Sequence, residues 1–380
     1  GRGLTYTNGT ITVTAANVTI QNLTFGDKAA LVVNTTGKFT LTGCTFTPTT
    51  TYTKDSNNQT LTSVRTAVNL NVGEAVVTNN TFHGTTDGYY NAIEFGIGSS
   101  ANDLGKATIT GNTFNSAIKN NYFNFYNMTA NASIEIQNNK FLLANKGSNA
   151  IRISNPKNVT GVIFNIDENE YTYVSDSTDS QYEGLILLQD YSGQKDTQNF
   201  SGITLNITNL SAPESAKQLL YVYDDQDGII SYNQPAVTGD NSIEKFAVAK
   251  VDDSYSPSLA SAVAVATNGQ TITLLKDTAL TSSISIEKNV TLDLGGKTLS
   301  RKGGMLLDIY GNVTIQNGTI AMTNTTGAGA DIWVNKTAKL TVEKSATISA
   351  PSNSFAIAYY KDCTAAKVTL KGTLTGDGSG

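Results

Sequence analysis

A short phrase that recurs along the chain limits the possible folds more than any other feature of this sequence. In its first copy, residues 18–25, apolar residues alternate with polar ones, a polar pair follows, and an aromatic residue closes the phrase. Further copies occupy residues 39–46, 75–82, 107–114 and 134–141, and a weaker one ends at Tyr171. Because the copies keep their length while the interval between them varies, the insertions must fall in loops. This behaviour is typical of repeats that stack in one direction.

A second short strand pattern lies between the copies of the phrase. It has the same period-2 alternation and occupies residues 67–70, 92–95, 122–125 and 150–153. Several short strands in each repeat, with no helical stretch between them, indicate the coils of a β-helix. One coil alone cannot bury its inward side chains, whereas stacked coils create one apolar column and pair every inner strand edge. The sequence therefore predicts an all-β fold, a right-handed parallel β-helix solenoid.

The polar pair of the phrase has a structural explanation. Asn80, Asn112 and Asn139 occupy the same place in successive copies, where the chain must turn sharply. Asparagine tolerates left-handed backbone geometry, and stacked amides can hydrogen-bond from coil to coil. We therefore expect an asparagine ladder at this corner. The aromatic residues that close the phrase should stack inside the solenoid.

The sequence pattern changes after residue 235. Residues 258–266 place apolar side chains at the spacing of an amphipathic helix, and Asn268-Gly269 ends that pattern. Short alternating strands follow again. The sequence thus predicts two tandem segments, residues 1–240 and 241–380. A short capping helix near 256–267 should cover the open end of the second segment and bury Leu259, Val263 and Ala266.

The residues from about 246 to 300 resemble a known family. The alanine-rich helix, the run Asn268–Asp277 and the run Val290–Thr298 are similar to the opening of pectate-lyase-like β-helix domains in bacterial surface proteins. This resemblance implies the fold and a bacterial surface location. The first segment resembles the same superfamily only through its general coil pattern.

That superfamily includes polysaccharide lyases and hydrolases, and the chain lacks most of their catalytic motifs. Polygalacturonase-type hydrolases carry an Asp-Asp pair ahead of a Gly-His-Gly motif, but the one histidine here, His83, precedes Asp224-Asp225. One histidine and the distant Cys44 and Cys363 exclude zinc spacings and a Ser-His-Asp triad. We therefore predict no catalytic residues, no metal site, no cofactor and no enzyme activity.

Composition limits the partners. The formal net charge is −5, and charged residues make up 15% of the chain, so nucleic acid has no electrostatic support as a partner. The sequence contains no run of apolar residues long enough to insert into a membrane. The remaining expected partners are an extracellular glycan or a host or cell-surface protein.

One group of outward-facing residues is a candidate binding site. With the inward residues set by the period-2 pattern, Asn69, Glu94, Asn124 and Arg152 should face outward on consecutive coils, about 4.8 Å apart. The next outward column should contain Tyr126 and lead toward Tyr223. A solvated sheet face explains this set, and so does a shallow carbohydrate-binding strip. The candidate ligand-binding residues are Glu94, Asn124, Tyr126, Arg152 and Tyr223.

These observations favour a non-enzymatic module of a secreted or cell-surface protein. Its role would be adhesin-like or structural, with carbohydrate binding on the outward strip. A polysaccharide lyase or glycoside hydrolase is the main alternative. A fragment of a phage tail spike is a further one, because it would share the fold.

Overall fold

A computed structural model of the chain shows two compact units, Gly1–Ile243 and Glu244–Gly380. A 3₁₀ helix, η1 (Asn241–Phe246), contains the division between them. The structure describes residues 4–48, 66–83, 91–97, 102–115, 121–143, 149–173, 184–189, 197–213, 216, 218–222, 231–233, 235–323, 329–351, 354–360, 363 and 365–375.

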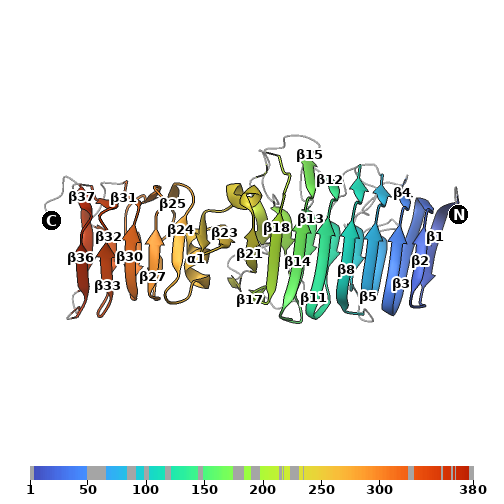
Figure 1. Ribbon diagram of the computed structural model, residues 1–380, viewed down its shortest axis with the longest axis horizontal. Helices are drawn as coiled ribbons and strands as arrows, with labels where there is room; N and C mark the ends of the chain where they lie inside the picture. The colour runs from blue at the N-terminus through green and yellow to red at the C-terminus, as the bar shows by residue number, and fades with distance from the viewer. Residues whose placement is uncertain are drawn as a thin grey trace, which may run out of the picture. The chain divides into compact units, whose positions relative to one another are not determined.

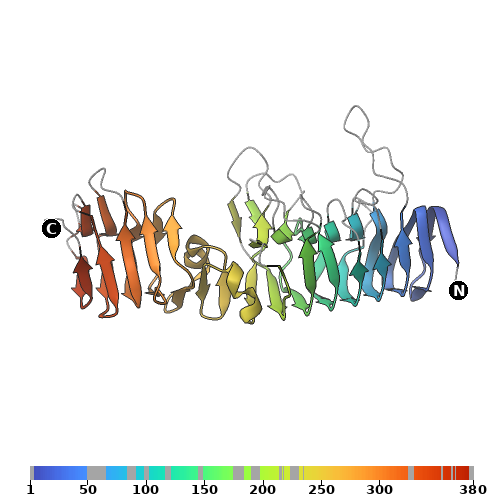
Figure 2. The same ribbon diagram turned by 90° about the horizontal axis from the view of Figure 1, so that it is seen from above.

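The first unit consists of parallel strands stacked coil upon coil (Figures 1 and 2). One stack contains β2 (Val18–Gln21), β3 (Thr24–Thr42), β5 (Thr66–Thr78), β8 (Leu104–Thr110), β11 (Met128–Gln137), β14 (Val162–Asp167), β18 (Ile203–Thr208) and β21 (Ala236–Gly239). A second continues from β3 with β4 (Thr45–Thr47), β6 (Thr81–Phe82), β9 (Thr113–Phe114), β12 (Lys140–Leu143) and β15 (Glu170–Tyr173).

A third stack completes each coil of the first unit. It contains β1 (Thr5–Val13), parts of β3 and β5, and then β7 (Asn91–Phe95), β10 (Asn121–Phe125), β13 (Asn149–Ile153), β16 (Gly184–Leu188) and β19 (Gln218–Val222). A separate parallel pair is formed by β17 (Thr197–Asn199) and β20 (Ser231–Asn233). Strands far apart in sequence therefore lie side by side, which is the arrangement of a parallel β-helix.

The second unit repeats this architecture with three separate sheets. The first contains β23 (Ser254–Ser256), β22 (Ala249–Val251), β24 (Thr271–Leu274), β27 (Val290–Asp293), β30 (Asn312–Gln316), β33 (Lys339–Val342) and β36 (Lys367–Leu370). The second contains β25 (Thr278–Leu280), β28 (Thr298–Arg301), β31 (Gly318–Met322), β34 (Ala346–Ser349) and β37 (Thr373–Thr375). The third contains β26 (Ile284–Ile286), β29 (Leu307–Ile309), β32 (Gly329–Val334) and β35 (Ser354–Tyr359). Among the described strands, antiparallel pairing is confined to β22, which pairs with β23 and with β24. The predicted all-β parallel β-helix is confirmed.

The predicted asparagine ladder runs through the first unit. The side-chain carbonyl of each ladder residue accepts from the backbone and side-chain amides of its predecessor, as when Asn80 donates to Asn112 at 3.0 and 2.9 Å. Asn112 donates to Asn139 in the same way, and Asn139 donates to Asn169. At one end, the Asn80 carbonyl accepts from the Cys44 backbone amide. All four ladder asparagines are buried, so their amides are satisfied away from water.

One detail of that prediction is wrong. The ladder asparagines do not carry the left-handed turn, because the residue before each of them does. Asn79 has a φ of 55°, Gly111 of 68° and Asn138 of 53°. The two residues have different roles: the first, an asparagine or glycine, supplies the left-handed backbone, and the buried second residue supplies the hydrogen-bonding amide.

The closing aromatics form the predicted interior stack. Their ring centroids lie between 4.5 and 5.3 Å apart with nearly parallel planes. The stacked residues are Phe25, Phe46, Phe82, Phe114, Phe141 and Tyr171. Each ring buries a large apolar area, so this column is a main contributor to the core of the unit.

The predicted helix is present in the second unit as α1 (Leu259–Val265), after β22 and β23. Ser258 caps it, because its hydroxyl accepts from the backbone amide of Ser261 at 3.1 Å. Leu259, Val263 and Ala266 are buried in the core of this unit, as expected, and the helix packs on β22, β23 and β24. The helix thus covers apolar side chains at the first coil, and it is the one α-helix in the described part of the chain.

Candidate functional site

The residues of the predicted strip lie in register on neighbouring strands, but they are not exposed. Asn124 pairs with Glu94 on one neighbouring strand and with Arg152 on the other, as the alternation predicts. However, the exposed fractions of Glu94, Asn124 and Arg152 are only 7%, 1% and 3%. Every residue of β7, β10 and β13 is buried on either face of the sheet. The expectation of a shallow, solvated strip is therefore wrong, because the outward face of these strands is covered as well.

Glu94 is the centre of a buried polar layer. Its carboxylate accepts hydrogen bonds from the Thr66 hydroxyl at 2.6 Å, the Asn91 amide at 2.7 Å and the Asn124 amide at 3.3 Å. Such bonds offset the cost of removing a carboxylate from water. The side-chain carbonyl of Asn124 is also buried, and it has no hydrogen-bond partner among the described residues.

Arg152 lies on the same face as Glu94 but has different hydrogen-bond partners. Its guanidinium donates to the Ser154 hydroxyl and to the Gln189 backbone carbonyl, both at 3.4 Å. Tyr126 is half-buried, and Tyr223 lies outside the described residues. The structure thus brings Glu94, Asn124 and Arg152 together in one interior layer. Their role in ligand binding stays a prediction.

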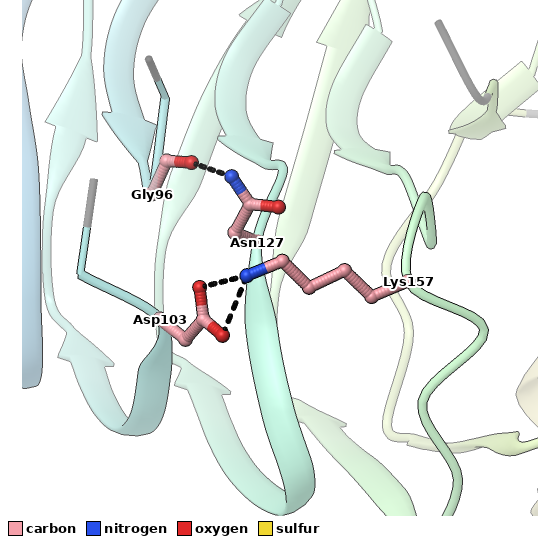
Figure 3. A network of polar contacts seen from close by, with 4 residues as sticks. All are labelled: Gly96, Asp103, Asn127 and Lys157. Carbon is pink, nitrogen blue, oxygen red and sulfur yellow. Dashed lines mark hydrogen bonds and ion pairs between the residues drawn. The ribbon is translucent and has the colours of Figure 1, made fainter. Parts of the chain in front are cut away.

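A corner of the first unit holds an ion pair that joins separate coils (Figure 3). The Lys157 ammonium lies 2.6 and 2.8 Å from the two carboxylate oxygens of Asp103. Beside it, the Asn127 amide donates to the backbone carbonyl of Gly96 at 2.6 Å. Gly96 has a φ of 69°, and a Cβ there would lie 2.6 Å from the Asn127 carbonyl oxygen, so the close approach requires glycine. Since the ion pair is partly exposed, it contributes about 0–1 kcal/mol and is structural.

His83, Asp224 and Asp225 are the other residues that the sequence singled out. His83 is exposed and follows the buried Phe82, while Asp224 and Asp225 lie outside the described residues. Among the residues that the structure describes, no group of three or more His, Cys, Asp or Glu side chains is placed to hold a metal ion. No helix in the described part of the chain is long and apolar enough to cross a membrane.

The second unit presents a cluster that the sequence analysis did not identify. Asp308 and Trp333 occupy paired outward positions on β29 and β32. Tyr310, Asn335 and Tyr360 directly follow β29, β32 and β35, so they lie at the ends of three neighbouring strands. We call these five residues the Trp333 face. Trp333 is the only tryptophan of the chain.

The Asp308 carboxylate holds this face together. One oxygen accepts from the Asn335 side-chain amide, and the other accepts from the Tyr360 hydroxyl at 3.5 Å. The hydrogen bond to Asp308 and the negative charge of that carboxylate raise the pKa of Tyr310. Burial, followed by the charge of Asp308, raises the pKa of Tyr360. Both phenols therefore stay protonated as hydrogen-bond donors far above neutral pH.

The rings of the face are oriented and accessible. The centroids of Trp333 and Tyr360 lie 4.8 Å apart with an interplanar angle of 44°. Tyr310 and Tyr360 are 48% and 38% exposed. In the part of the chain that the structure describes, no lysine or arginine lies within ion-pair distance of Asp308. The face thus combines two exposed tyrosine rings and the half-buried Trp333 ring with a buried carboxylate and a buried amide, those of Asp308 and Asn335.

Asp331 lies on the same strand as Trp333, two residues before it, and is fully buried. Neither of its carboxyl oxygens has a hydrogen-bond partner within normal distance among the described residues. Burial raises the pKa of this carboxyl to about 8, and the nearby backbone of Met322 only partly opposes the shift. The protonated, neutral form of Asp331 therefore predominates at neutral pH.

The alternation of the sequence contained a signal for the Trp333 face. Asp308 and Tyr310 are two residues apart, as are Trp333 and Asn335, so each pair points to one side of its strand. What the sequence could not supply is the register that places the two pairs on neighbouring coils.

Comparison with known proteins gives a fold-level likeness only. No family model matches the chain, and no curated protein matches it. Similar solved structures are those of the PL6 family alginate lyase AlyGC. A mutant form is 12% identical, with 98% of this chain and 78% of that chain covered and a TM-score of 0.27. A second AlyGC structure is 11% identical, with 97% and 76% covered and a TM-score of 0.25.

This comparison corrects one prediction. The sequence predicted no enzyme activity, whereas the solved structures that the chain resembles are those of lyases, which contradicts that prediction. At these identities and TM-scores the likeness transfers no residue, reaction or substrate to this chain. The parallel β-helix itself is established by the strand pairing.

Proposed function

We propose that the chain is a carbohydrate-binding β-helix module of a secreted or cell-surface protein, and that the Trp333 face contacts the sugar. This proposal extends the adhesin-like role expected from the sequence. An extracellular glycan is the expected partner, and a surface protein that carries such a glycan would be bound in the same way.

The observation that supports it is the exposed, oriented pair of tyrosines around Asp308. Aromatic rings can cover the apolar face of a sugar while their polar tips remain hydrated. The Tyr360 hydroxyl donates to Asp308 at 3.5 Å, and the Tyr360 ring lies 4.8 Å from that of Trp333, so this ring is oriented before any ligand arrives. Such preorganisation reduces the entropy lost on binding.

The hydroxyl groups of the two tyrosines suit sugar hydroxyls, because a phenol can both donate and accept a hydrogen bond. Asp308 and Asn335 are buried and bonded to each other, so they support the rings from below. Because Asp308 has no cationic neighbour within ion-pair distance in the described part, the face favours neutral glycans or amino sugars over uronate polymers.

The first experiment is a glycan array probed with the full chain, followed by titration calorimetry with the strongest ligand. Trp333→Ala should weaken binding at least tenfold, because it removes a ring that the sugar would cover. Tyr359→Ala is the matched control: Tyr359 is an exposed neighbouring tyrosine, but it pairs with the inward Val334 rather than with Trp333. Equal affinities of Trp333→Ala and the unaltered chain would refute the site.

Mixtures of the chain with glycans also test whether it is an enzyme, and its oligomeric state tests the tail-spike alternative. Release of new sugar ends would identify an enzyme, and the variant that abolishes it would locate the catalytic groups. A stable trimer in sedimentation would favour the tail-spike alternative.

A further inference from the structure

Several turns of the first unit present asparagine side chains in a shared arrangement. These asparagines have left-handed backbone geometry, are exposed and stand two residues before a serine or threonine. They are Asn17 (φ 61°), Asn22 (φ 54°), Asn79 (φ 55°), Asn131 (φ 61°) and Asn158 (φ 50°). We call them the turn asparagines.

The fold explains why asparagine is present at these turns but gives its amide nitrogen no hydrogen-bond partner among the described residues. A left-handed turn favours Gly or Asn over other residues, which accounts for the backbone. The ladder amides are consumed by hydrogen bonds, whereas the side-chain amide nitrogens of the turn asparagines make no hydrogen bond within the described ranges. The Oδ1 atoms of Asn22, Asn79 and Asn131 lie over a turn glycine of the next coil, whereas the amide nitrogens are not held by a hydrogen bond to any described residue.

The sequence around each of these amides has a second property. Asn-x-Ser/Thr, with x other than proline, is the acceptor motif for N-linked glycans, and it marks exposed loops of secreted proteins. The motif reads Asn22-Leu23-Thr24 at one turn and Asn79-Asn80-Thr81 at another. Backbone geometry alone does not require the hydroxyl residue, because Asn138 makes the same exposed turn, with a φ of 53°, and is followed two residues later by Lys140.

We propose that the turn asparagines are acceptor sites for N-linked glycans. In the transfer, the asparagine Nδ2 forms a bond to the anomeric carbon of a lipid-pyrophosphate-linked oligosaccharide. The bond from that carbon to the pyrophosphate oxygen breaks, and the lipid pyrophosphate leaves with the electron pair. The amide proton passes to a base of the transferase. The inference relies on export of the chain, as in the proposed function, but not on its binding of sugar.

Two further turns should be poorer acceptors, for a reason visible in the structure. Asn209 and Asn317 also have left-handed geometry and the motif. However, the Asn209 amide donates to Asp167 at 3.0 Å, and the Asn317 amide donates to Asp293 at 2.8 Å. These amides must give up a charge-assisted hydrogen bond before they can react. Their glycan occupancy should therefore be lower than that of the turn asparagines.

The test uses the full chain with an export leader and a fused reporter peptide that carries one acceptor motif, in a host that glycosylates this reporter. Intact mass and glycopeptide mapping give the occupancy of each turn. Thr24→Ala and Thr81→Ala should each remove one glycan while the turn asparagine is kept. Lys140→Thr creates the motif at Asn138 and should add one glycan. It removes only the exposed ion pair with Glu170, which contributes little to stability.

The reporter makes the outcome decisive. A glycosylated reporter beside bare turn asparagines would overturn the inference, as would an unmodified Asn138 in the Lys140→Thr variant. Because the leader provides export and occupancy is read by mass, failure of the glycan array would not affect this result.

Discussion

The side-chain carbonyl of Asn112 accepts two hydrogen bonds from Asn80, one from the backbone amide at 3.0 Å and one from the side-chain amide at 2.9 Å. Asn112 repeats the arrangement as a donor to Asn139. Each ladder residue therefore accepts hydrogen bonds from the amides of the preceding coil and donates its own amides to the next coil. A ladder of this kind fixes the register of the coils, because a shift by one residue would leave several buried amides without partners.

Replacement of one ladder residue should consequently cost more than a single exposed hydrogen bond. Asn112→Ala removes the acceptor of two buried donors of Asn80, and each orphaned group costs about 1–3 kcal/mol. Urea unfolding followed by circular dichroism measures the loss. Asn138→Gly is the control, because the exposed turn keeps its left-handed backbone, and its stability should change by less than about 0.5 kcal/mol. Equal effects of the two variants would contradict the ladder.

The aromatic stack should be equally sensitive. Phe114 lies between Phe82 and Phe141 in the column, and its ring also contacts Tyr122 and Phe123 edge-on. Phe114→Ala should therefore destabilise the first unit by about 3–5 kcal/mol, through lost burial and the cavity that remains. Phe355→Ala, at an exposed ring of the second unit, should leave stability nearly unchanged. Differential scanning calorimetry of both variants tests this; a small effect at Phe114 would mean that the column relaxes into the gap.

The capping role of α1 can be tested with two substitutions on the same helix, one at a buried and one at an exposed residue. Leu259→Asp places a charge among Val263, Ala266 and the first strands, which should cost a few kcal/mol. Val265→Asp changes an exposed residue of the same seven-residue helix and should have little effect. Thermal unfolding of the two variants compares them directly. A similar melting temperature for both would show that α1 does not seal the core.

The fold was predictable because its signals are local and repeated. The phrase that closes at Phe25, Phe46 and Phe82 specifies strand, corner and inward ring in each coil, and stacking follows from the need to bury them. The site was less predictable. Alternation correctly placed Glu94, Asn124 and Arg152 on one outward column, but it contains no information on whether that column is covered. The Trp333 face was not predicted, because Asp308 and Trp333 become neighbours only through the register of two coils.

Asp331 should make the stability of the second unit depend on pH in an unusual direction. Its folded pKa of about 8 lies above the ordinary value of 3.8, so the folded state retains a proton that the unfolded state has lost between these two pH values. Stability should therefore fall as the pH rises through this window, by about 1.4 kcal/mol per pH unit at most, and the loss is complete above pH 8. Below the unfolded pKa both states are protonated and the group contributes nothing.

Asp331→Asn cannot ionise, so it should remove this contribution to the slope and stabilise the protein at pH 7 relative to the unaltered chain. Asp253→Asn, at an exposed position of the same unit, should retain the slope. Urea unfolding of the three proteins at several pH values between 5 and 9 measures the difference, and the gap between Asp331→Asn and the unaltered chain should widen with increasing pH. If the two curves ran parallel, the Asp331 carboxyl would have to be ionised within the folded structure, and a water molecule or a cation would have to lie beside it.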